Sequence, residues 1–394
     1  MKKFIHASPR WALLLMVSFT LALTVGPTRT YAEGAGAAAG TWNLVPSPNV
    51  PGVGQGLYAV TAISASDAWA VGDIYEGTLT QHWDGTRWKT VPSPAVRNAY
   101  NHLTGVSGLS SNDVWAVGYT IDDLTYAWQA LILHWNGTRW NIVRGATLGT
   151  SYNVFTRVLA LAPNDVWAVG YNGTSIKFHT LAEHWDGLSW KAIPTPAPGT
   201  YDALYGIAGT GPNDLWAAGY YKQGNLTYKS LALHWDGIAW VEVESPSTTG
   251  YNWFNGVTAT AANDVWAVGY QLEDNGNAIS HPLIQRWDGT DWSIVENPPV
   301  PDGHYTNLSD AAWISSTDVV AVGTSTHASD NYDPLVEQWD GTGWSLAAAP
   351  EMRGLPTTLV FAVAPDKAGG YWAVGWAQKP SPLTFKNYII RRTP

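Results

Sequence analysis

The sequence predicts an all-β fold, a seven-bladed β-propeller with four antiparallel strands per blade. Two repeated phrases predict it. The first, DVWAVG or a close variant, recurs every 46 to 54 residues, at Trp69, Trp115, Trp167, Trp216, Trp266, Val320 and Trp372. The second, HWDGTRW or a variant, occurs six times and places two Trp five residues apart, starting at Trp83, Trp135, Trp185, Trp235, Trp287 and Trp339. A period near 50 residues with four short strands per unit is typical of propeller blades.

The four strands of each unit follow in order. A Leu-x-x-Val segment comes first and the WAVG segment second. In DVWAVG the alternation places Trp115 and Val117 on one face and Val114 and Ala116 on the other. Both faces are apolar, as in a sheet covered on both sides. The third strand ends in His-Trp-Asp-Gly. The fourth, Trp-x-x-Val, ends in proline, which cannot donate to a ladder, so we expect this strand to lie outermost.

One strand is missing from the last unit, and this is the third observation. After strands at residues 360–364, 371–375 and 388–391 the chain stops. The stretch TWNLVPSPNVPG, which starts at Thr41, resembles the end of a unit, RWKTVPSPAVRN. The first three strands of a unit do not precede it. We therefore expect the N-terminal strand, residues 41–46, to complete the C-terminal blade and close the ring.

Two positions depart from the repeat. Val320 replaces the second-strand Trp of the sixth unit, and Trp313 stands on its first strand where earlier units have Ala or Gly. We interpret the pair as a large-for-small exchange that conserves core volume. The third-strand positions His82, His134, His184 and His234 become Arg286 and Gln338 later, which suggests interchangeable polar residues.

The N-terminus reads as a signal peptide. Lys2, Lys3 and Arg10 precede an apolar run from Trp11 to Val25. This run is shorter than the roughly 20 residues that span a bilayer, which favours cleavage near Ala32 over membrane insertion. We expect residues 1–32 to be removed, 33–40 to be a Gly/Ala linker, and 41–394 to be a single domain of a secreted, monomeric protein.

Composition excludes several classes of partner and chemistry. Without the leader the chain carries 17 basic and 31 acidic residues, a formal charge of −14. This argues against nucleic acid and anionic membranes as partners. The chain has no cysteine, so disulfide frameworks, thiol catalysis and thiolate metal sites are excluded.

VWAVGY followed by LILHWNGTRWNIV resembles the repeat of the kelch and galactose-oxidase type of propeller, over residues 41–394. In that family a glycine-ended second strand pairs with an aromatic on the third strand and a Trp shortly after it. The double glycine of the family is reduced here to one, and Trp stands where its Tyr would be. The resemblance implies the fold. The copper chemistry of galactose oxidase needs a Tyr crosslinked to Cys, which this chain lacks. Sialidase chemistry needs three converging Arg, and no such triad is recognisable.

The connections between strands fall on two faces. First-to-second and third-to-fourth turns share one face and hardly vary, and their Asp, Asn and Gly suit tight turns. The repeated turn Asp, at Asp67, Asp113, Asp165, Asp214, Asp264 and Asp318, could also form a cation ring, but turn chemistry is the reading we favour. Second-to-third connections and the segments between units share the other face and vary, which favours this face for recognition.

Candidate ligand-binding residues lie on the variable face. Before the first strand of five units stands a Tyr followed by a polar residue: Tyr100 and Asn101, Tyr152 and Asn153, Tyr201 and Asp202, Tyr251 and Asn252, and Tyr305. Trp128, Trp253 and Trp376 fall in predicted loops outside the repeat, and His102 and His304 lie nearby. Flat aromatics beside amide and carboxylate groups suit sugars. The alternative is that each Tyr packs between blades while Asn shapes the turn.

These observations favour a non-catalytic propeller that binds a glycan, or an extracellular or cell-envelope protein, without metal or cofactor. The alternative is a metal-dependent, lyase-like enzyme acting on extracellular polysaccharide, with two or three of His102, His179, His281, His304 and His327 converging near Asp202. A DNG element at residues 274–276 hints more weakly at calcium, since other oxygen ligands of a calcium loop are absent.

Overall fold

The computed structural model describes residues 40–394 except 76, 147, 225–226, 274–278, 301–304 and 327–330. The predicted signal peptide and nearly all of the predicted linker lie outside these residues, as do His304, His327 and the DNG element. Ala32–Pro394 forms one compact unit. Its described part is all-β, and it contains no helix of the length and apolarity that crossing a bilayer requires.

Four consecutive strands form each antiparallel set. The strands of the first half are β2 (Gln55–Ser64), β3 (Asp67–Ile74), β4 (Gly77–Trp83), β5 (Trp88–Thr90), β6 (Ala99–Ser110), β7 (Asp113–Asp122), β8 (Trp128–Trp135), β9 (Trp140–Val143), β10 (Tyr152–Ala162), β11 (Asp165–Thr174), β12 (Lys177–Trp185) and β13 (Trp190–Ile193). The sets β6–β9 and β10–β13 are joined into one eight-stranded sheet by a parallel bridge between Tyr152 and Trp128.

The remaining sets follow the same order. Their strands are β14 (Asp202–Gly211), β15 (Asp214–Gln223), β16 (Thr227–Trp235), β17 (Trp240–Val243), β18 (Tyr251–Ala261), β19 (Asp264–Leu272), β20 (Ser280–Trp287), β21 (Trp292–Val295), β22 (Thr306–Ser315), β23 (Asp318–Thr326), β24 (Tyr332–Trp339), β25 (Trp344–Leu346), β26 (Thr357–Pro365), β27 (Tyr371–Pro380) and β28 (Leu383–Arg392). The last sheet takes its fourth strand from the chain start, β1 (Trp42–Leu44).

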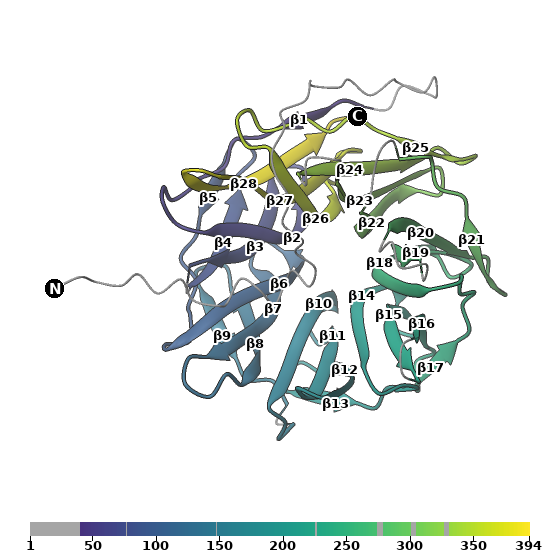
Figure 1. Cartoon of the computed structure of the whole chain (residues 1–394). Helices are drawn as coiled ribbons and strands as arrows, with labels where there is room; N and C mark the ends of the chain where they lie inside the picture. Colours follow the sequence, from purple (N-terminus) through teal and green to yellow (C-terminus); the bar gives the residue numbers. More distant parts are fainter. Residues whose placement is uncertain are drawn as a thin grey trace. The chain divides into compact units, whose positions relative to one another are not determined.

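The sheets are arranged around a centre as a β-propeller (Figure 1). The first strands of consecutive sets contact one another in the order β2, β6, β10, β14, β18, β22, β26 and back to β2. β1 pairs with β28 in the register Trp42 to Arg392, Asn43 to Arg391 and Leu44 to Ile390. The two ends of the domain therefore share a sheet, as the missing strand predicts.

Tryptophan fills the space between consecutive sheets. Trp69 packs on Trp135 and Trp140 of the next set, with ring centroids 4.9 and 5.2 Å away and the second contact edge-on. The same three-Trp contact recurs with Trp115, Trp185 and Trp190, with Trp167, Trp235 and Trp240, with Trp216, Trp287 and Trp292, with Trp266, Trp339 and Trp344, and with Trp372, Trp83 and Trp88. Large rings packed against small Ala and Val faces explain the repeated DVWAVG pattern.

The expected exchange between Val320 and Trp313 is wrong, because the two side chains lie in different interfaces. Trp313 packs against the cluster that contains Trp266 and Trp339, whereas Val320 belongs to the cluster shared with the closing sheet. There Tyr371, which is fully buried, occupies a position that is Ala, Val or Leu in other sets. Tyr371 therefore supplies bulk in the interface where the second-strand Trp is missing.

The third-strand His is not an interchangeable polar residue either. His82 Nε2 is hydrogen-bonded to Asp67 Oδ1 at 2.8 Å, and its ring packs on Trp69 at 4.6 Å. Equivalent pairs are His134 with Asp113, His184 with Asp165, His234 with Asp214, and Arg286 with Asp264. These turn carboxylates thus fix the third strand. In the other turn the Asx interpretation is confirmed, since Asp84 Oδ1 accepts from Thr86 N and Arg87 N at 2.9 Å.

Candidate binding surface

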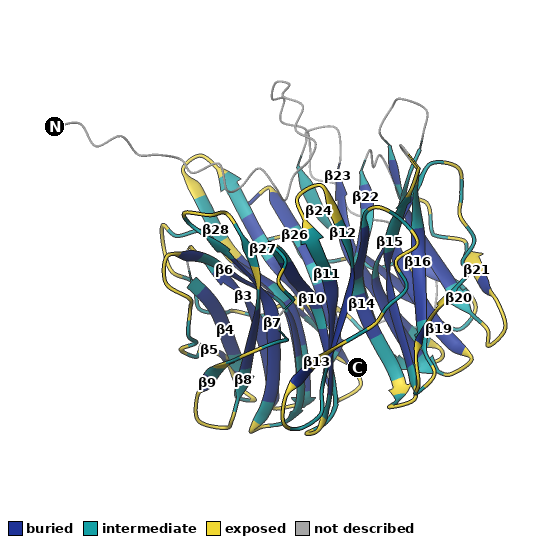
Figure 2. Ribbon diagram, turned by 90° about the horizontal axis from the view of Figure 1, so that it is seen from below, coloured by how far each residue is buried: buried dark blue, intermediate teal, exposed yellow. Residues whose placement is uncertain are grey.

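The face that carries the second-to-third connections, here called the loop face, exposes large apolar side chains at its tips. Buried residues line the strands and exposed residues gather at the connections at both ends of the sheets (Figure 2). On the loop face the exposed large hydrophobics are Tyr75, Leu124, Tyr126, Ile176 and Leu383, between 63% and 86% exposed. The opposite face also exposes Leu188 and Ile238, 87% and 86% exposed, so these tips alone do not identify a contact surface.

A cluster of rings on this face, here called the aromatic patch, surrounds Trp253 on β18. Tyr270 stacks on one side of the Trp253 ring at 4.8 Å and Tyr228 stacks at 5.1 Å. Tyr220 and Tyr251 meet it edge-on at 5.8 and 5.7 Å. All five side chains are only half-buried. A ligand can therefore reach part of each side chain, although the hydroxyl groups of Tyr220 and Tyr270 are buried.

A cation lies beside the patch. Lys222 Nζ is 5.1 Å from the centre of the Tyr201 ring and 5.6 Å from that of Tyr228. Tyr201 packs edge-on against Phe178 at 5.0 Å. An ammonium group over an aromatic ring is attracted by the ring quadrupole. Its remaining N–H donors can still pair with an anion from solvent.

His102 belongs to a second, more deeply buried ring cluster. Its Nδ1 lies 3.0 Å from Asp73 Oδ2, and its ring contacts Tyr58 at 4.3 Å and Tyr119 at 5.1 Å. The hydroxyl of Tyr100 donates to the same carboxylate. Because His102 and Asp73 are almost fully buried, they hold β6, the first strand of one set, to β3, the second strand of the preceding set, and are not presented to solvent.

The three predicted loop Trp lie in strands, which corrects the sequence-based expectation. Trp128 opens β8, stacked between Tyr119 at 4.7 Å and Tyr152 at 5.7 Å. Trp376 lies in β27, near Phe361 at 6.3 Å and Phe385 at 5.8 Å. A Cβ on Gly56 would lie 2.6 Å from the Trp376 ring, so this glycine makes room for it. The packing alternative thus describes Trp128 and Trp376 well, since both rings rest on neighbours.

Tyr100, Tyr152 and Tyr251 are strand residues as well, rather than residues ahead of the strand. Tyr201 and Tyr305 form single parallel bridges, to Phe178 and Ser280. Strand pairing thus begins earlier than the hydrophobic pattern indicates, because the extended entry segments bond to the previous set.

The polar residues after these Tyr hold the entry segments. Asn101 Oδ1 accepts from Val96 N at 2.7 Å, and Asn252 Oδ1 accepts from Thr248 N at 3.2 Å. Asn153 Nδ2 donates to Thr150 O at 2.8 Å. The alternative in which the amide shapes the turn matches this geometry, since each amide is buried against its own loop.

Asp202 is buried at the equivalent position. Its Oδ1 accepts from Gly199 N at 2.8 Å, and its Oδ2 lies 3.0 Å from His179 Nδ1. Burial raises the pKa of Asp202, and His179 opposes that shift. His281 pairs instead with Glu273 at 2.9 Å. Within the described ranges no group of three or more His, Cys, Asp or Glu could hold a metal ion.

Sequence reasoning missed a set of Tyr that follow the second-strand glycine. They are Tyr119, Tyr171, Tyr220 and Tyr270, and the repeated dipeptide GY was the available signal. By strand alternation they share a side with the second-strand Trp. Burial raises the pKa of each hydroxyl, with neighbouring Tyr adding to the shift, so all stay protonated donors at neutral pH.

Comparison with known proteins supports the fold. No family model matches the chain, and no curated protein does. A solved structure described as "YCF48 bound to D1 peptide" has a TM-score of 0.54 and 14% identity, covering 91% of this chain and 100% of that one. YCF48 from Cyanidioschyzon merolae gives a TM-score of 0.51 and 15% identity, covering 90% and 99%. At such identities the similarity shows the β-propeller fold alone, and the kelch-type resemblance stays a prediction.

Proposed function

We propose that the chain is an exported, seven-bladed propeller that binds a protein or glycan ligand through its loop face, without catalysis. In this proposal residues 1–32 are the signal peptide, 33–40 the linker and 41–394 the blades. The cyclic contacts of the first strands support the blade number.

The observation that carries the binding proposal is the aromatic patch with its adjacent cation. Half-buried rings lose little conformational entropy on binding, and their hydroxyls can pair with backbone amides or sugar hydroxyls. Trp253 is held between Tyr228 and Tyr270, so its geometry is set before a ligand arrives. Preorganisation of this kind reduces the cost of binding.

The exposed loop tips favour a large ligand. A stable protein contact buries about 800 Å² on each partner, more than one ring cluster supplies. Leu124 and Ile176, 86% and 76% exposed, extend the apolar area beyond the patch. A macromolecular ligand that also covers these tips is therefore favoured over a free monosaccharide.

The test is a screen of the chain on a glycan array and on a phage-displayed peptide library, followed by affinity measurement for each selected ligand. In the double variant Tyr251→Ala and Trp253→Ala we expect affinity to fall at least tenfold. Ile238→Ser is the matched control, because Ile238 is an 86% exposed apolar residue in the turn Asp236–Ala239, on the opposite face.

Ligands that bind the double variant as tightly as the unaltered chain, with unchanged melting temperature, would contradict the proposal. A large drop in melting temperature in the double variant would point to the packing alternative instead. The single variant Tyr251→Ser then separates the two, because it removes a peripheral ring and leaves the stack on Trp253.

A further inference from the structure

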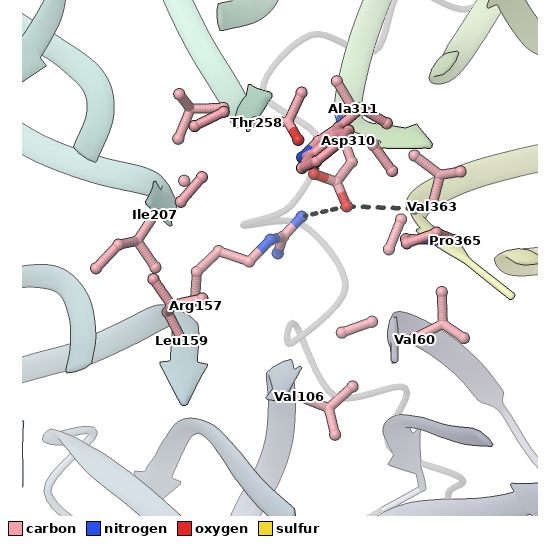
Figure 3. A pocket seen from close by; sticks show the side chains of 18 of the residues that line it. Val60, Val106, Arg157, Leu159, Ile207, Thr258, Asp310, Ala311, Val363 and Pro365 are labelled. Carbon is pink, nitrogen blue, oxygen red and sulfur yellow. Dashed lines mark hydrogen bonds and ion pairs between the residues drawn. The ribbon is translucent and has the colours of Figure 1, made fainter. Parts of the chain in front are cut away.

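A cavity runs along the centre of the propeller, between the first strands. Its volume is about 530 Å³, within the range of about 300 to 1,000 Å³ typical of small-molecule sites. Figure 3 shows its aliphatic wall, formed by side chains from different strands: Val60, Val106, Leu159, Ile207 and Val363. Most of these side chains keep only a few per cent of their surface, and that remainder faces the cavity.

Three charged residues are among those that line the cavity: Arg157, Asp310 and Lys367. Arg157 and Asp310 point toward each other across it, with Nη2 and Oδ2 3.8 Å apart (Figure 3). Lys367 is exposed in the turn between β26 and β27. It therefore marks the end of the cavity on the face of the first-to-second turns, here called the turn face. The lining therefore carries a net positive charge.

Arg157 and Asp310 are exceptions to the repeat. Each directly follows the bulge of its first strand, where the register shifts against the second strand. The other first strands place a small residue there: Ala59, Gly105, Gly206, Gly256 and Ala362. A Cβ on Gly105 would lie 2.9 Å from Arg157 Cα, so adjacent strands approach closely at this level. Five of the seven sets form the same bulge with a small residue, so the fold does not require a charge at this position.

The guanidinium is fixed but not saturated. Nη1 donates to Thr104 O at 2.9 Å and to Thr156 O at 3.2 Å, and Nη2 donates to Phe361 O at 3.4 Å. These three bonds are fewer than the five N–H donors of a guanidinium. The Asp310 carboxylate is engaged elsewhere, since Oδ2 accepts from Val363 N at 3.2 Å and Oδ1 from Ala311 N at 3.0 Å. An ion pair of 3.8 Å leaves Arg157 able to take a second, closer anion.

We propose that this cavity binds an unbranched aliphatic carboxylate of medium chain length, with its carboxylate at Arg157 and its hydrocarbon chain along Val106 and Ile207. The ligand enters past Lys367 from the turn face. Burial of methylene groups against the apolar walls stabilises the complex. The net positive charge of the lining residues favours an anion over a neutral or cationic amphiphile. The site is separate from the aromatic patch, so it does not depend on the function proposed above.

Isothermal titration calorimetry on the chain tests this, with decanoate, octanoate, 1-decanol and decyltrimethylammonium as probes. We expect one decanoate per chain. Octanoate binds roughly sixteenfold more weakly, about fourfold for each lost methylene. Decanol binds at least tenfold more weakly than decanoate, and the cation does not bind. Equal affinity for decanol and decanoate, or no heat with decanoate up to millimolar concentrations, would overturn the proposal.

Variants locate the site. Ile207→Trp fills the cavity and should abolish decanoate binding, whereas Ile142→Trp, at a half-exposed position on β9, should leave it unchanged. Asp310→Asn removes the competing carboxylate and should tighten binding several-fold. Arg157→Gln should weaken it at least tenfold, and if that variant does not fold, Lys367→Asn on the exposed turn is expected to lower affinity two- to threefold. Undisturbed binding to Ile207→Trp would place the ligand elsewhere and refute the assignment.

Discussion

The sheet β22–β25 meets its neighbours in two different ways. Toward the preceding sheet it presents Trp339 and Trp344, which pack on Trp266 at 5.0 and 5.4 Å like the other three-Trp contacts. Toward the closing sheet it presents Val320, and the bulk comes from Tyr371 and Trp42, with ring centroids 6.5 Å apart. The same architectural contact is thus built once from repeated Trp and once from residues of both chain ends.

Polar contacts accompany the change at the closing interface. The Tyr371 hydroxyl donates to Asp318 O at 2.7 Å, and Arg392 lies 4.5 Å from the centre of the Tyr371 ring. Arg392 also pairs with Asp318, whose equivalents pair with a His or Arg of their own set. The difference teaches that the closing interface combines ring volume from Tyr371 and Trp42 with polar contacts to Asp318, where the other interfaces are filled by the repeated Trp.

The largest effect is expected from removing the closing strand. Deleting residues 41–48 removes the buried Trp42, worth roughly 4 to 6 kcal/mol before entropy. It also removes the Pro48 carbonyl, which accepts from Gln81 Nε2 at 2.8 Å and Asn387 Nδ2 at 3.0 Å. We expect the melting temperature to fall by more than about 10 °C. Deleting 33–39 is the control, and equal melting curves for the two deletions would refute closure.

Next in size are single truncations in the two kinds of interface. Trp266→Ala empties a fully buried site and should cost about 3 to 5 kcal/mol in the free energy of unfolding. Val320→Ala should cost clearly less, because fewer atoms are lost and Tyr371 remains. Urea denaturation of both variants measures the difference. A larger loss from Val320→Ala would show that the closing interface relies on the second-strand residue after all.

Glu337 on β24 should make the stability of this sheet pH-dependent. At the same register position, Gln81 and Gln285 donate to Pro48 O and Pro246 O, both at 2.8 Å. Neither oxygen of the buried Glu337 has a hydrogen-bond partner among the described residues. Burial raises the pKa of Glu337 to about 8. A protonated carboxyl donates as an amide does, so we expect Glu337 to be neutral in the folded protein.

The folded pKa lies above the ordinary value of 4.5, so the folded state binds more protons than the unfolded state between these two pH values. The contribution of Glu337 to the free energy of unfolding is therefore fully present below pH 4.5. This contribution is lost as the pH rises through about 8. Glu337→Gln should be more stable than the unaltered chain at pH 8 by a few kcal/mol and similar at pH 4.5. A difference that does not change with pH would contradict this.

The smallest effect is expected from Tyr371→Phe. It deletes the hydroxyl that donates to Asp318 O and keeps the ring, which should cost about 1 kcal/mol. Tyr388→Phe is a matched comparison in the same cluster, since its hydroxyl donates to Pro350 O at 2.6 Å in the connection between β25 and β26. A loss of several kcal/mol in Tyr371→Phe alone would mean that the polar contact, rather than ring volume, dominates the interface.

Much of the fold follows from the sequence, because each repeat contains the Trp and the small residues that pack between consecutive sheets. The period, the strand order and the displaced strand at Trp42 are visible as matching phrases. The failure at Val320 has a physical cause: a pattern within one unit does not reveal which face of the sheet a side chain covers. Trp313 and Val320 lie on adjacent strands, where Trp313 pairs with Val319 and Ala312 with Val320, yet they belong to different interfaces.

The candidate surface was harder to predict. Asn101 and Asp202 stand out in the sequence, but each accepts a hydrogen bond from a backbone N–H of its own loop, and no motif specifies these partners. Lys222 and Tyr228 lie near the end of β15 and the start of β16, in stretches without a repeat, so their position beside Tyr201 or Trp253 depends on how adjacent sets pack. Arg157 and Asp310 were detectable only after alignment on the bulge, which the sequence does not display.

Pairing of β1 with β28 is tested most directly by a disulfide. The chain has no cysteine, and Asn43 lies opposite Arg391 in the ladder. Opposite residues of an antiparallel pair have Cα atoms about 4.5 to 5.5 Å apart, within the disulfide range. We expect Asn43→Cys with Arg391→Cys to lose two hydrogen masses on mild oxidation of the monomer and to melt at a higher temperature. Two titratable thiols persisting in the folded, oxidised monomer would contradict closure of the ring by the chain ends.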